Sequence, residues 1–310
     1  MVRMRITYRR KDNNMNEVAT VVVTYNRKEL LRECIQALLD SEVKSDIYII
    51  DNASTDGTKD FIKDLLGPAV TYKRLKKNIG GAGGFAAGMN YVVHKGYKYI
   101  WIMDDDTIVN KDSLTKLLDG AEALGGEFGF LSSTVRWTDG TYCKMNRQTV
   151  KRPDTKADRL CMRRGLMPVK AATFVSLLFN VNAVKGLGLP KKEYFIWGDD
   201  KEYTSRISDH RNCYNVVESE VVHKMATNSG SNITEDEIGR IDRYFYAYRN
   251  DFATARDKGS GELFVYVAGF VLNAIRVIIR AKDNKTKRLR IMLKGLAAGI
   301  FFKPKVRYVK

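Results

Sequence analysis

Apolar segments alternate with amphipathic segments over the first hundred residues of the chain. The segment VATVVVTY at residues 18–25 is mostly β-branched, which is typical of a strand buried on both faces. In residues 27–40, leucine, isoleucine and cysteine recur at the spacing of one helix face. The same reasoning predicts strands at residues 47–50, 70–75 and 97–103 and helices at residues 59–66 and about 84–95. Alternating strands and helices with short connections predict an α/β fold with a mostly parallel sheet flanked by helices.

The pattern is less regular farther along the chain. Few apolar residues occur between 134 and 169, where we expect a hairpin and a mobile loop. Later strands are predicted at residues 171–181 and 214–222, with a short helix between them, and the pattern is helical from residue 235. We therefore expect a polar lead-in at residues 1–16, an α/β domain at residues 17–234 and a helical region at residues 235–310.

Polar residues cluster where each of the first four predicted strands ends. These clusters lie at residues 24–27, 51–55, 78–84 and 104–106. The carboxyl ends of parallel strands meet at one edge of a sheet, and ligands of such sheets bind there. Four polar clusters at one edge predict a binding site.

Three carboxylates, Asp104, Asp105 and Asp106, directly follow the fourth predicted strand. Adjacent carboxylates repel one another unless a cation lies among them. Mg²⁺ and Mn²⁺ bind carboxylates together with substrate phosphates, and alternate residues of an extended segment face the same way. We expect Asp104 and Asp106 to share a divalent cation. A solvated acidic turn that caps the next helix is the alternative.

Glycines dominate the segment NIGGAGGF at residues 78–85. Glycine lets the backbone approach a ligand closely, and the N-terminus of the following helix favours anions. A flexible loop is the alternative. A loose match to the dinucleotide-binding pattern begins at Gly81, but it follows the third strand rather than the first. A nicotinamide-dependent oxidoreductase is therefore not favoured.

A second acidic cluster, Asp199, Asp200 and Glu202, lies about 100 residues downstream, next to Trp197. A sugar ring packs well on an aromatic face, and a carboxylate beside it can accept a proton from a hydroxyl group. Acids at a helix N-terminus also stabilise the helix dipole, which is the structural alternative. His223 ends the last predicted strand, downstream of both clusters, and is a candidate ligand.

The net charge of +17 points to the phosphate groups of a nucleic acid, a nucleotide or an anionic lipid. About +11 of it lies in residues 276–310. The remaining chain is mildly basic and its clustered acids would repel a nucleic acid, which disfavours a non-catalytic nucleic-acid-binding module. Apolar residues mixed with lysine and arginine near the C-terminus instead predict helices lying on an anionic membrane. A helical cap with a solvated basic face is the alternative.

The cysteines and the N-terminal residues indicate the cellular location of the protein. The four cysteines are widely separated and form no CxxC pair, which favours reduced thiols. The charged N-terminus lacks the apolar segment of a signal peptide, and the apolar run at residues 263–275 is short for a membrane span. We expect a cytoplasmic protein held peripherally at the inner face of the cell membrane.

Taken in this order, the motifs resemble those of the family 2 glycosyltransferases, which have the GT-A fold. The matching segments are TYNR (24–27), DNASTDGT (51–58), NIGG (78–81), DDD (104–106) and DDKEY (199–203), followed by His223. The resemblance covers about two-thirds of the chain. It implies inverting transfer of a sugar from a nucleotide-sugar, with Mn²⁺ or Mg²⁺ as cofactor.

The resemblance implies a role for each matched residue. The donor would be bound by Thr24, Asn26, Arg27, Asp51, Asn52, Asn78, Gly80, Gly81, Gly83, Gly84, Asp104 and Asp105. The metal ligands would be Asp104, Asp106 and His223. Asp200 would be the catalytic base, and the acceptor would be contacted by Trp197, Asp199 and Glu202.

Two segments, NIGGAGGF and WGDDKEY, are most similar to those of bacterial galactofuranosyltransferases, and YRN at residues 248–250 matches a further element of the family. This resemblance implies UDP-galactofuranose as the donor. The acceptor would be a hydroxyl group of a glycan or lipid-linked glycan in cell-surface polysaccharide synthesis. A rhamnosyltransferase that uses dTDP-rhamnose is the alternative among enzymes.

Overall fold

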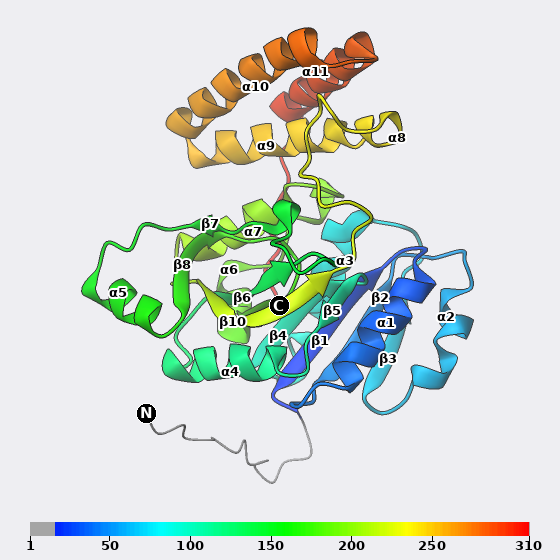
Figure 1. Cartoon of the computed structure of the whole chain (residues 1–310), viewed down its shortest axis with the longest axis vertical. Helices are drawn as coiled ribbons and strands as arrows, with labels where there is room; N and C mark the ends of the chain where they lie inside the picture. The colour runs from blue at the N-terminus through cyan, green and yellow to red at the C-terminus, as the bar shows by residue number, and fades with distance from the viewer. Residues whose placement is uncertain (1–15, 310) are drawn as a thin grey trace.

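The computed structural model describes residues 16–309, and its twisted sheet lies beneath a layer of helices (Figure 1). Four parallel strands in the order β3-β2-β1-β4 form one half of the sheet, which confirms the parallel arrangement predicted for them. Their bounds are β1 Val18–Thr24, β2 Asp46–Asp51, β3 Val70–Arg74 and β4 Tyr99–Asp104. The lead-in predicted at residues 1–16 lies, except for Asn16, outside the described residues.

Apolar side chains cover both faces of β1. Val18 and Val22 belong to a cluster with α1 and α4, whereas Ala19, Val21 and Val23 belong to a second cluster with α3, α6 and α7. These helices are α1 Lys28–Leu39, α3 Gly80–Val92, α4 Ser113–Ala123, α6 Val181–Leu187 and α7 Asp199–Ser208. A strand between two apolar layers has no solvent-exposed face, which is why its sequence is mostly apolar.

The other half of the sheet is mixed, so the parallel arrangement does not continue beyond β4. β9 runs antiparallel between β4 and β6, and β10 is parallel to β6 but antiparallel to β8 and β5. The bounds are β5 Thr107–Val109, β6 Phe130–Arg136, β7 Thr149–Val150, β8 Leu166–Ala171, β9 Leu177–Asn180 and β10 Tyr214–His223. β5 follows the three aspartates directly, and its pairing with β10 sets His223 opposite Thr107.

Two elements that the sequence predicts as continuous are interrupted in the structure. The helix expected at residues 59–66 is divided into α2 (Thr58–Phe61) and the 3-10 turn η1 (Lys63–Leu65). The apolar run at residues 171–181 is not one strand, because β8 ends at its first residue, Ala171, and β9 begins only at Leu177. Ser176 lies between these strands with a φ of 57°, which interrupts the extended backbone.

Residues 134–169 contain regular elements where a loop was predicted. They include the 3-10 turn η2 (Lys144–Asn146), β7 and the helix α5 (Lys156–Arg163). α5 begins at a capping box, in which Thr155 Oγ1 accepts from Asp158 N (3.0 Å) and the Asp158 carboxylate accepts from Thr155 N (3.2 Å). The helix was missed because it is only eight residues long and four of them are charged.

The glycine-rich segment forms the first half of α3 rather than a loop before a helix. α3 begins four residues earlier than predicted, at Gly80. A Cβ on Gly84 would lie 2.6 Å from Val23 Cγ1 and 2.9 Å from Asn52 Nδ2, and a Cβ on Gly88 would overlap Val21. Glycine at these places lets α3 lie directly on the sheet, so packing explains Gly84 without a ligand.

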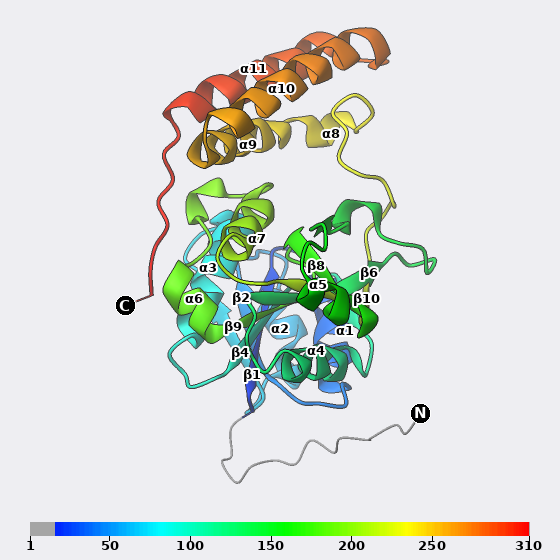
Figure 2. The same ribbon diagram turned by 90° about the vertical axis from the view of Figure 1, so that its left-hand side faces the viewer.

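The C-terminal helices form a separate layer in which α9 is nearest the sheet domain (Figures 1 and 2). They are α8 Ile238–Ile241, α9 Tyr244–Lys258, α10 Ser260–Arg280 and α11 Lys285–Phe301. A Cβ on Gly295 or Gly299 of α11 would overlap atoms of α9, so the two helices lie very close. The chain after α11 runs back down the side of the sheet domain (Figure 2), where Leu189 N donates to Arg307 O (2.8 Å).

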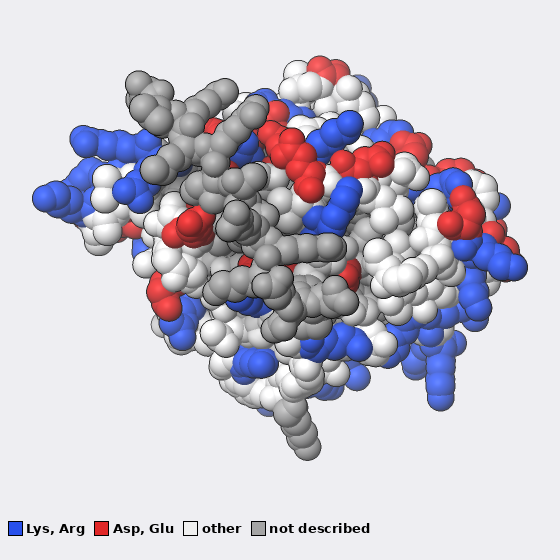
Figure 3. Space-filling view, turned by 90° about the horizontal axis from the view of Figure 1, so that it is seen from below, with Lys and Arg blue, Asp and Glu red and all other residues white. Residues whose placement is uncertain are grey.

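α10 is longer than the apolar run in the sequence suggested. Its 21 residues are enough, by length and composition, to cross a membrane, and most of its apolar side chains are exposed. The face of the molecule farthest from this helical layer has a different character, because it carries both acidic and basic side chains (Figure 3). More than half of the exposed large apolar side chains among the described residues lie on α10 and α11.

Candidate active site

The turns after β1 and β2 meet at one edge of the sheet, as predicted. Asn26 has a φ of 54°, its backbone N–H donates to Ser54 Oγ (2.9 Å), and its Oδ1 accepts from Thr55 N (2.7 Å). Asn52 N donates to Thr24 O (2.9 Å). These bonds bring Thr24, Asn26 and Asn52 side by side, from two strands that are far apart in the sequence.

Asp51 lies beneath this pair of turns and is only 1% exposed. Its Oδ1 accepts from Ser54 N (2.8 Å), and its Oδ2 accepts from the hydroxyl of Tyr72 on β3. Burial and the hydrogen bond to Asp51 raise the pKa of Tyr72, so this hydroxyl keeps its proton. The sequence did not single out Tyr72, because no motif surrounds it.

Asn78 and Asn52 hold the start of α3. Asn78 Oδ1 accepts from Gly80 N (2.8 Å), Asn52 Nδ2 donates to Gly80 O (3.1 Å), and Asn52 Oδ1 accepts from Ile79 N (3.3 Å). Three of the four glycines predicted to bind the donor are closed off by packing: Gly80 against Phe195 O, Gly83 against Ile79, and Gly84 against Val23 and Asn52. Gly81 alone of these four has open space beside its Cα.

Asp105, the middle carboxylate of the triple aspartate, faces β1. Thr24 Oγ1 donates to Asp105 Oδ2 (2.7 Å), and Arg27 Nη1 donates to Asp105 Oδ1 (3.3 Å) and Asp106 Oδ2 (2.7 Å). Burial raises the pKa of Asp105 to about 6, although the charge of Arg27 acts against that rise. The Arg27 side chain remains half-exposed, so part of its guanidinium is free to meet a solvent-borne anion.

Asp104, Asp106 and His223 form a group whose ligand atoms all lie within 4.8 Å of one another. His223 Nε2 lies 2.9 Å from Asp106 Oδ1. Burial and the charge of Asp106 raise the pKa of Asp104 to about 8. Burial also acts to raise the pKa of Asp106, but the hydrogen bond and charge of His223 outweigh it and lower that pKa. Burial acts to lower the pKa of His223, yet the same pairing raises it to about 10.

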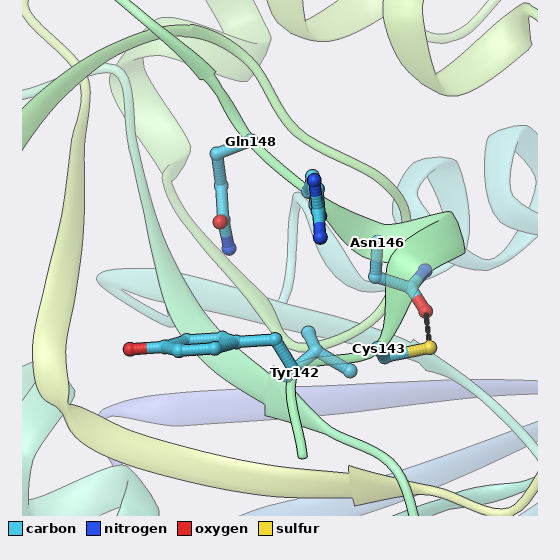
Figure 4. Close-up of a pocket in the computed structure, with 6 residues that line it drawn as sticks. Tyr142, Cys143, Asn146 and Gln148 are labelled. Atoms are coloured by element: carbon cyan, nitrogen blue, oxygen red, sulfur yellow. Dashed lines mark hydrogen bonds between the residues drawn. The ribbon is translucent and has the colours of Figure 1, made fainter. Parts of the chain in front are cut away.

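The other ring nitrogen of His223 is fixed by residues that the sequence did not single out. His223 Nδ1 donates to Asn146 Oδ1 (2.8 Å), which also accepts from Cys143 Sγ (2.9 Å; Figure 4). Asn146 Nδ2 in turn donates to Thr173 Oγ1 (2.8 Å). Asn146 comes from the segment that was expected to be mobile, which is why it was missed.

A cavity of about 280 Å³ adjoins these residues (Figure 4). It is lined by Val135, Tyr142, Cys143, Asn146, Arg147 and Gln148. Its amide, guanidinium and aromatic groups suit a polar ligand with hydroxyl groups. The cavity lies next to the side chains that orient His223.

Asp104, Asp106 and His223 fit a divalent cation. Two carboxylates and one imidazole are oxygen and nitrogen ligands of the kind that Mn²⁺ and Mg²⁺ sites use. An imidazole whose Nδ1–H is bound by a carbonyl oxygen presents its Nε2 as the ligand atom, and this is the arrangement that Asn146 gives His223. The protons held by Asp104 and His223 are those that a cation would displace.

The second acidic cluster begins α7, with Gly198 as the N-cap residue. Burial raises the pKa of Asp199 well above its ordinary value, and the charges of Asp200 and Asp104 add to the rise. Burial also raises the pKa of Asp200, to about 6, while the side chain stays partly exposed. The charge of Asp104 acts on Asp199, so these two carboxylates are near one another.

Glu202 lies in buried ion pairs, and its contact with an acceptor stays a prediction. It is 5% exposed, and its Oε1 accepts from Lys191 Nζ (3.3 Å) and Arg206 Nε (2.9 Å). A helix turns by about 100° per residue, so Glu202 lies on the side of α7 opposite Asp200. Trp197 lies edge-on against Tyr244 of α9, with ring centroids 4.8 Å apart.

Comparison with known proteins relates this chain to a family of enzymes. The family model described as Glycosyl transferase family 2 matches residues 20–182, more than half of the chain. The galactofuranosyltransferase GlfT1 of Mycolicibacterium smegmatis is 29% identical over 196 residues, which are 61% of this chain. The match spans 65% of that relative, which is less than two thirds of its length.

Two solved structures share the fold. The mannosyltransferase PcManGT from Pyrobaculum calidifontis, in complex with GDP-Man and Mn²⁺, has a TM-score of 0.55 at 17% identity, covering 93% of this chain and 86% of that one. GalNAc-T7 with UDP, GalNAc and Mn²⁺ has a TM-score of 0.60 at 14% identity, covering 79% of this chain and 48% of that one. At these identities the likeness shows the fold alone, which is the GT-A arrangement expected from the motifs.

We predict that Asp104→Asn weakens Mn²⁺ binding by about tenfold or more, because it removes one of three ligands. Asp105→Asn is the matched control, since Thr24 and Arg27 already occupy that carboxylate, and it should have a smaller effect. For the wild-type protein, affinity should rise with pH, because Asp104, with a pKa of about 8, must lose its proton to bind the ion. Titration calorimetry at several pH values measures both effects; equal losses in the two variants would contradict the assignment.

Proposed function

The chain belongs to glycosyl transferase family 2, and we propose that it transfers galactofuranose from UDP-galactofuranose to a hydroxyl group of a glycan or lipid-linked glycan. The observation that carries the proposal is the group Asp104, Asp106 and His223, which fits a divalent cation, in a chain that matches the family over more than half of its length. Galactofuranose as the donor sugar is supported by the segments NIGGAGGF and WGDDKEY and by the 29% identity to GlfT1. The product would serve cell-surface polysaccharide synthesis.

In this proposal the turns after β1 and β2 bind the nucleoside of the donor. Thr24, Asn26, Asp51 and Asn52 lie at adjoining turns, and their side chains offer hydrogen-bond donors and acceptors. Arg27, half-exposed and charged, would attract a phosphate group. Asn78 and the open backbone at Gly81 would border the same pocket, while Gly80, Gly83 and Gly84 would shape it by letting α3 pack closely.

A divalent cation bound to Asp104, Asp106 and His223 would neutralise the charge that develops on the diphosphate leaving group. Protein side chains would stabilise and orient the residues that hold this cation. Thr24 and Arg27 bind Asp105 and thereby reduce the repulsion within the triple aspartate. Asn146 orients His223 through its Nδ1–H.

Asp200 is the proposed general base. Its pKa of about 6 leaves it mostly ionised at neutral pH and basic enough to accept a proton. As the acceptor oxygen forms a bond to the anomeric carbon, its proton passes to Asp200 and the bond from that carbon to the diphosphate oxygen breaks. One displacement from the opposite face inverts the anomeric configuration, through a transition state with oxocarbenium character.

The donor is tested with a panel of nucleotide-sugars. We expect metal-dependent hydrolysis or transfer with UDP-galactofuranose to exceed that with dTDP-rhamnose, UDP-galactopyranose and GDP-mannose by about tenfold or more. The same panel read by thermal shift separates binding from turnover. A preference for dTDP-rhamnose would replace the galactofuranosyl proposal with a rhamnosyl one and leave the family unchanged.

Replacing Asp200 tests the base. We predict that Asp200→Asn lowers the transfer rate by about 10²- to 10⁴-fold, because the amide cannot accept the proton, while UDP binding stays nearly unchanged. For the wild type, kcat should fall as the pH drops below about 6, where Asp200 becomes protonated. Asp209→Asn, an exposed aspartate just beyond the end of α7, is the control. Wild-type turnover by Asp200→Asn would exclude this residue as the base.

We also propose that the helical layer holds the protein on an anionic membrane, at its cytoplasmic face. α10 and α11 expose large apolar side chains, among them Phe264 (75%), Ile279 (71%) and Phe301 (82%). Many lysines and arginines lie on the same two helices, such as Arg276, Arg280 and Lys294. Apolar side chains that enter the headgroup region next to basic residues bind anionic bilayers, and a lipid-linked acceptor would lie in that layer.

Flotation with anionic liposomes tests this attachment. We expect the pair Phe264→Ser and Ile279→Ser to reduce the floated fraction severalfold, because both side chains are exposed on α10. The control pair is Leu160→Ser and Met162→Ser, which are exposed on the distant α5. Substitutions are used instead of deleting the C-terminal helices, because Met292 of α11 packs in an apolar core with α9 and a deletion would remove that packing. Release by high salt indicates that the basic residues dominate the attachment, and resistance to salt indicates that the apolar side chains of α10 do.

A further inference from the structure

The loop at residues 194–198, which leads into Asp199 and Asp200, has an unusual backbone. Phe195, Trp197 and Gly198 have φ angles of 67°, 64° and 79°. Only glycine adopts this left-handed region without a conformational cost, so the two aromatic residues must be held there by their surroundings. The loop therefore depends on contacts from outside its own sequence.

Asn250 of α9 supplies the central contacts. Its side chain is fully buried, and the family match YRN at residues 248–250 had no physical explanation in the sequence. Asn250 Nδ2 lies within hydrogen-bond distance of three carbonyl oxygens of the loop: those of Tyr194 (3.0 Å), Ile196 (3.2 Å) and Trp197 (2.7 Å). Its Oδ1 accepts from Arg249 Nε (3.0 Å), so both ends of the amide are engaged.

Arg249 extends the same attachment toward the start of the loop. Its Nη2 donates to Glu193 O and Tyr194 O, both at 3.0 Å. Its guanidinium also lies over the Phe302 ring, 4.0 Å from the centroid, which holds it in place. Two neighbouring side chains of α9, Arg249 and Asn250, thus bind the backbone of the loop. These hydrogen bonds do not depend on the identity of the loop side chains.

α3 holds the loop from the other side. Phe195 O accepts from Ala82 N (3.2 Å), and a Cβ on Gly80 would overlap this carbonyl. The Phe195 ring stacks on Tyr246 of α9, with centroids 5.1 Å apart. The loop is therefore clamped between the helix that carries the glycine-rich motif and the first long helix of the C-terminal layer.

We propose that Asn250 is a positioning residue, which holds the 194–198 loop and thereby fixes the first turn of α7, where Asp200 lies. It acts through backbone carbonyls and is fully buried, so it touches neither donor nor acceptor. This inference rests on the proposed role of Asp200 as the base. It gives α9 a part in catalysis that a simple cap on the sheet domain would not have.

Asn250→Asp tests the proposal, because it keeps the size of the side chain and removes the amide donors. We expect kcat for transfer to fall about 10- to 100-fold, as a displaced base does, while the donor KM and UDP affinity with Mn²⁺ stay within about twofold. Hydrogen–deuterium exchange should become faster at the amides of residues 195–200. Asn250→Gln, which retains an amide on a longer side chain, should recover part of kcat and of the protection.

Arg288→Gln is the matched control in the helical layer. Arg288 is also buried and donates to backbone carbonyls, those of Ile233 and Asp236, but these lie before α8 and not in the loop. It should leave kcat and the exchange of residues 195–200 unchanged. If Asn250→Asp does not fold, the same readouts are taken on Asn250→Gln, for which intermediate losses of kcat and protection are expected.

Two results would overturn the inference. One is an Asn250 variant with wild-type kcat and wild-type exchange in the loop. The other is a parallel loss of UDP affinity and kcat, which indicates general damage to the domain rather than a displaced base. If the wild type transfers no sugar from any donor, the proposed function fails, while loop exchange in the variants still reports whether Asn250 holds the loop.

Discussion

The repulsion among three carboxylates at the end of β4 is the constraint on which the site depends. Two of them, Asp105 and Asp106, are buried, and their charges cannot be left without partners. Arg27 and Thr24 reach them from the turn after β1, and His223 reaches Asp106 from the end of β10. This arrangement requires both the parallel half of the sheet and the β5–β10 pairing that sets His223 opposite Thr107.

Close packing supports the same edge of the sheet. Glycines let α3 lie directly against β1 and against the Phe195 carbonyl, so the turns after β1 and β2 and the loop before α7 share one helix as a neighbour. α9 lies on the other side of that loop and also carries α10 and α11. The helix layer with the exposed apolar surface is therefore connected to the acidic residues of α7 by side chains that bind backbone atoms.

The contacts of several residues became known only from the tertiary structure. Asn146 and Cys143 lie in a segment with few apolar residues, yet Asn146 holds the ring of His223. Glu202 belongs to an acidic motif, but helical geometry turns it into a buried ion pair with Lys191. In both cases the chemistry of a side chain was visible in the sequence, whereas the direction in which it points was not.

The sequence by itself determined the four parallel strands, the polar turns at their ends and the grouping of Asp104 with Asp106, because each follows from local periodicity and from the rule that strand ends share an edge. Only the tertiary structure decided the mixed half of the sheet, the partners of His223 and the hold of Asn250 on a strained loop. Those features depend on contacts between residues tens of positions apart. Local pattern carries no information about which distant backbone group a side chain will meet.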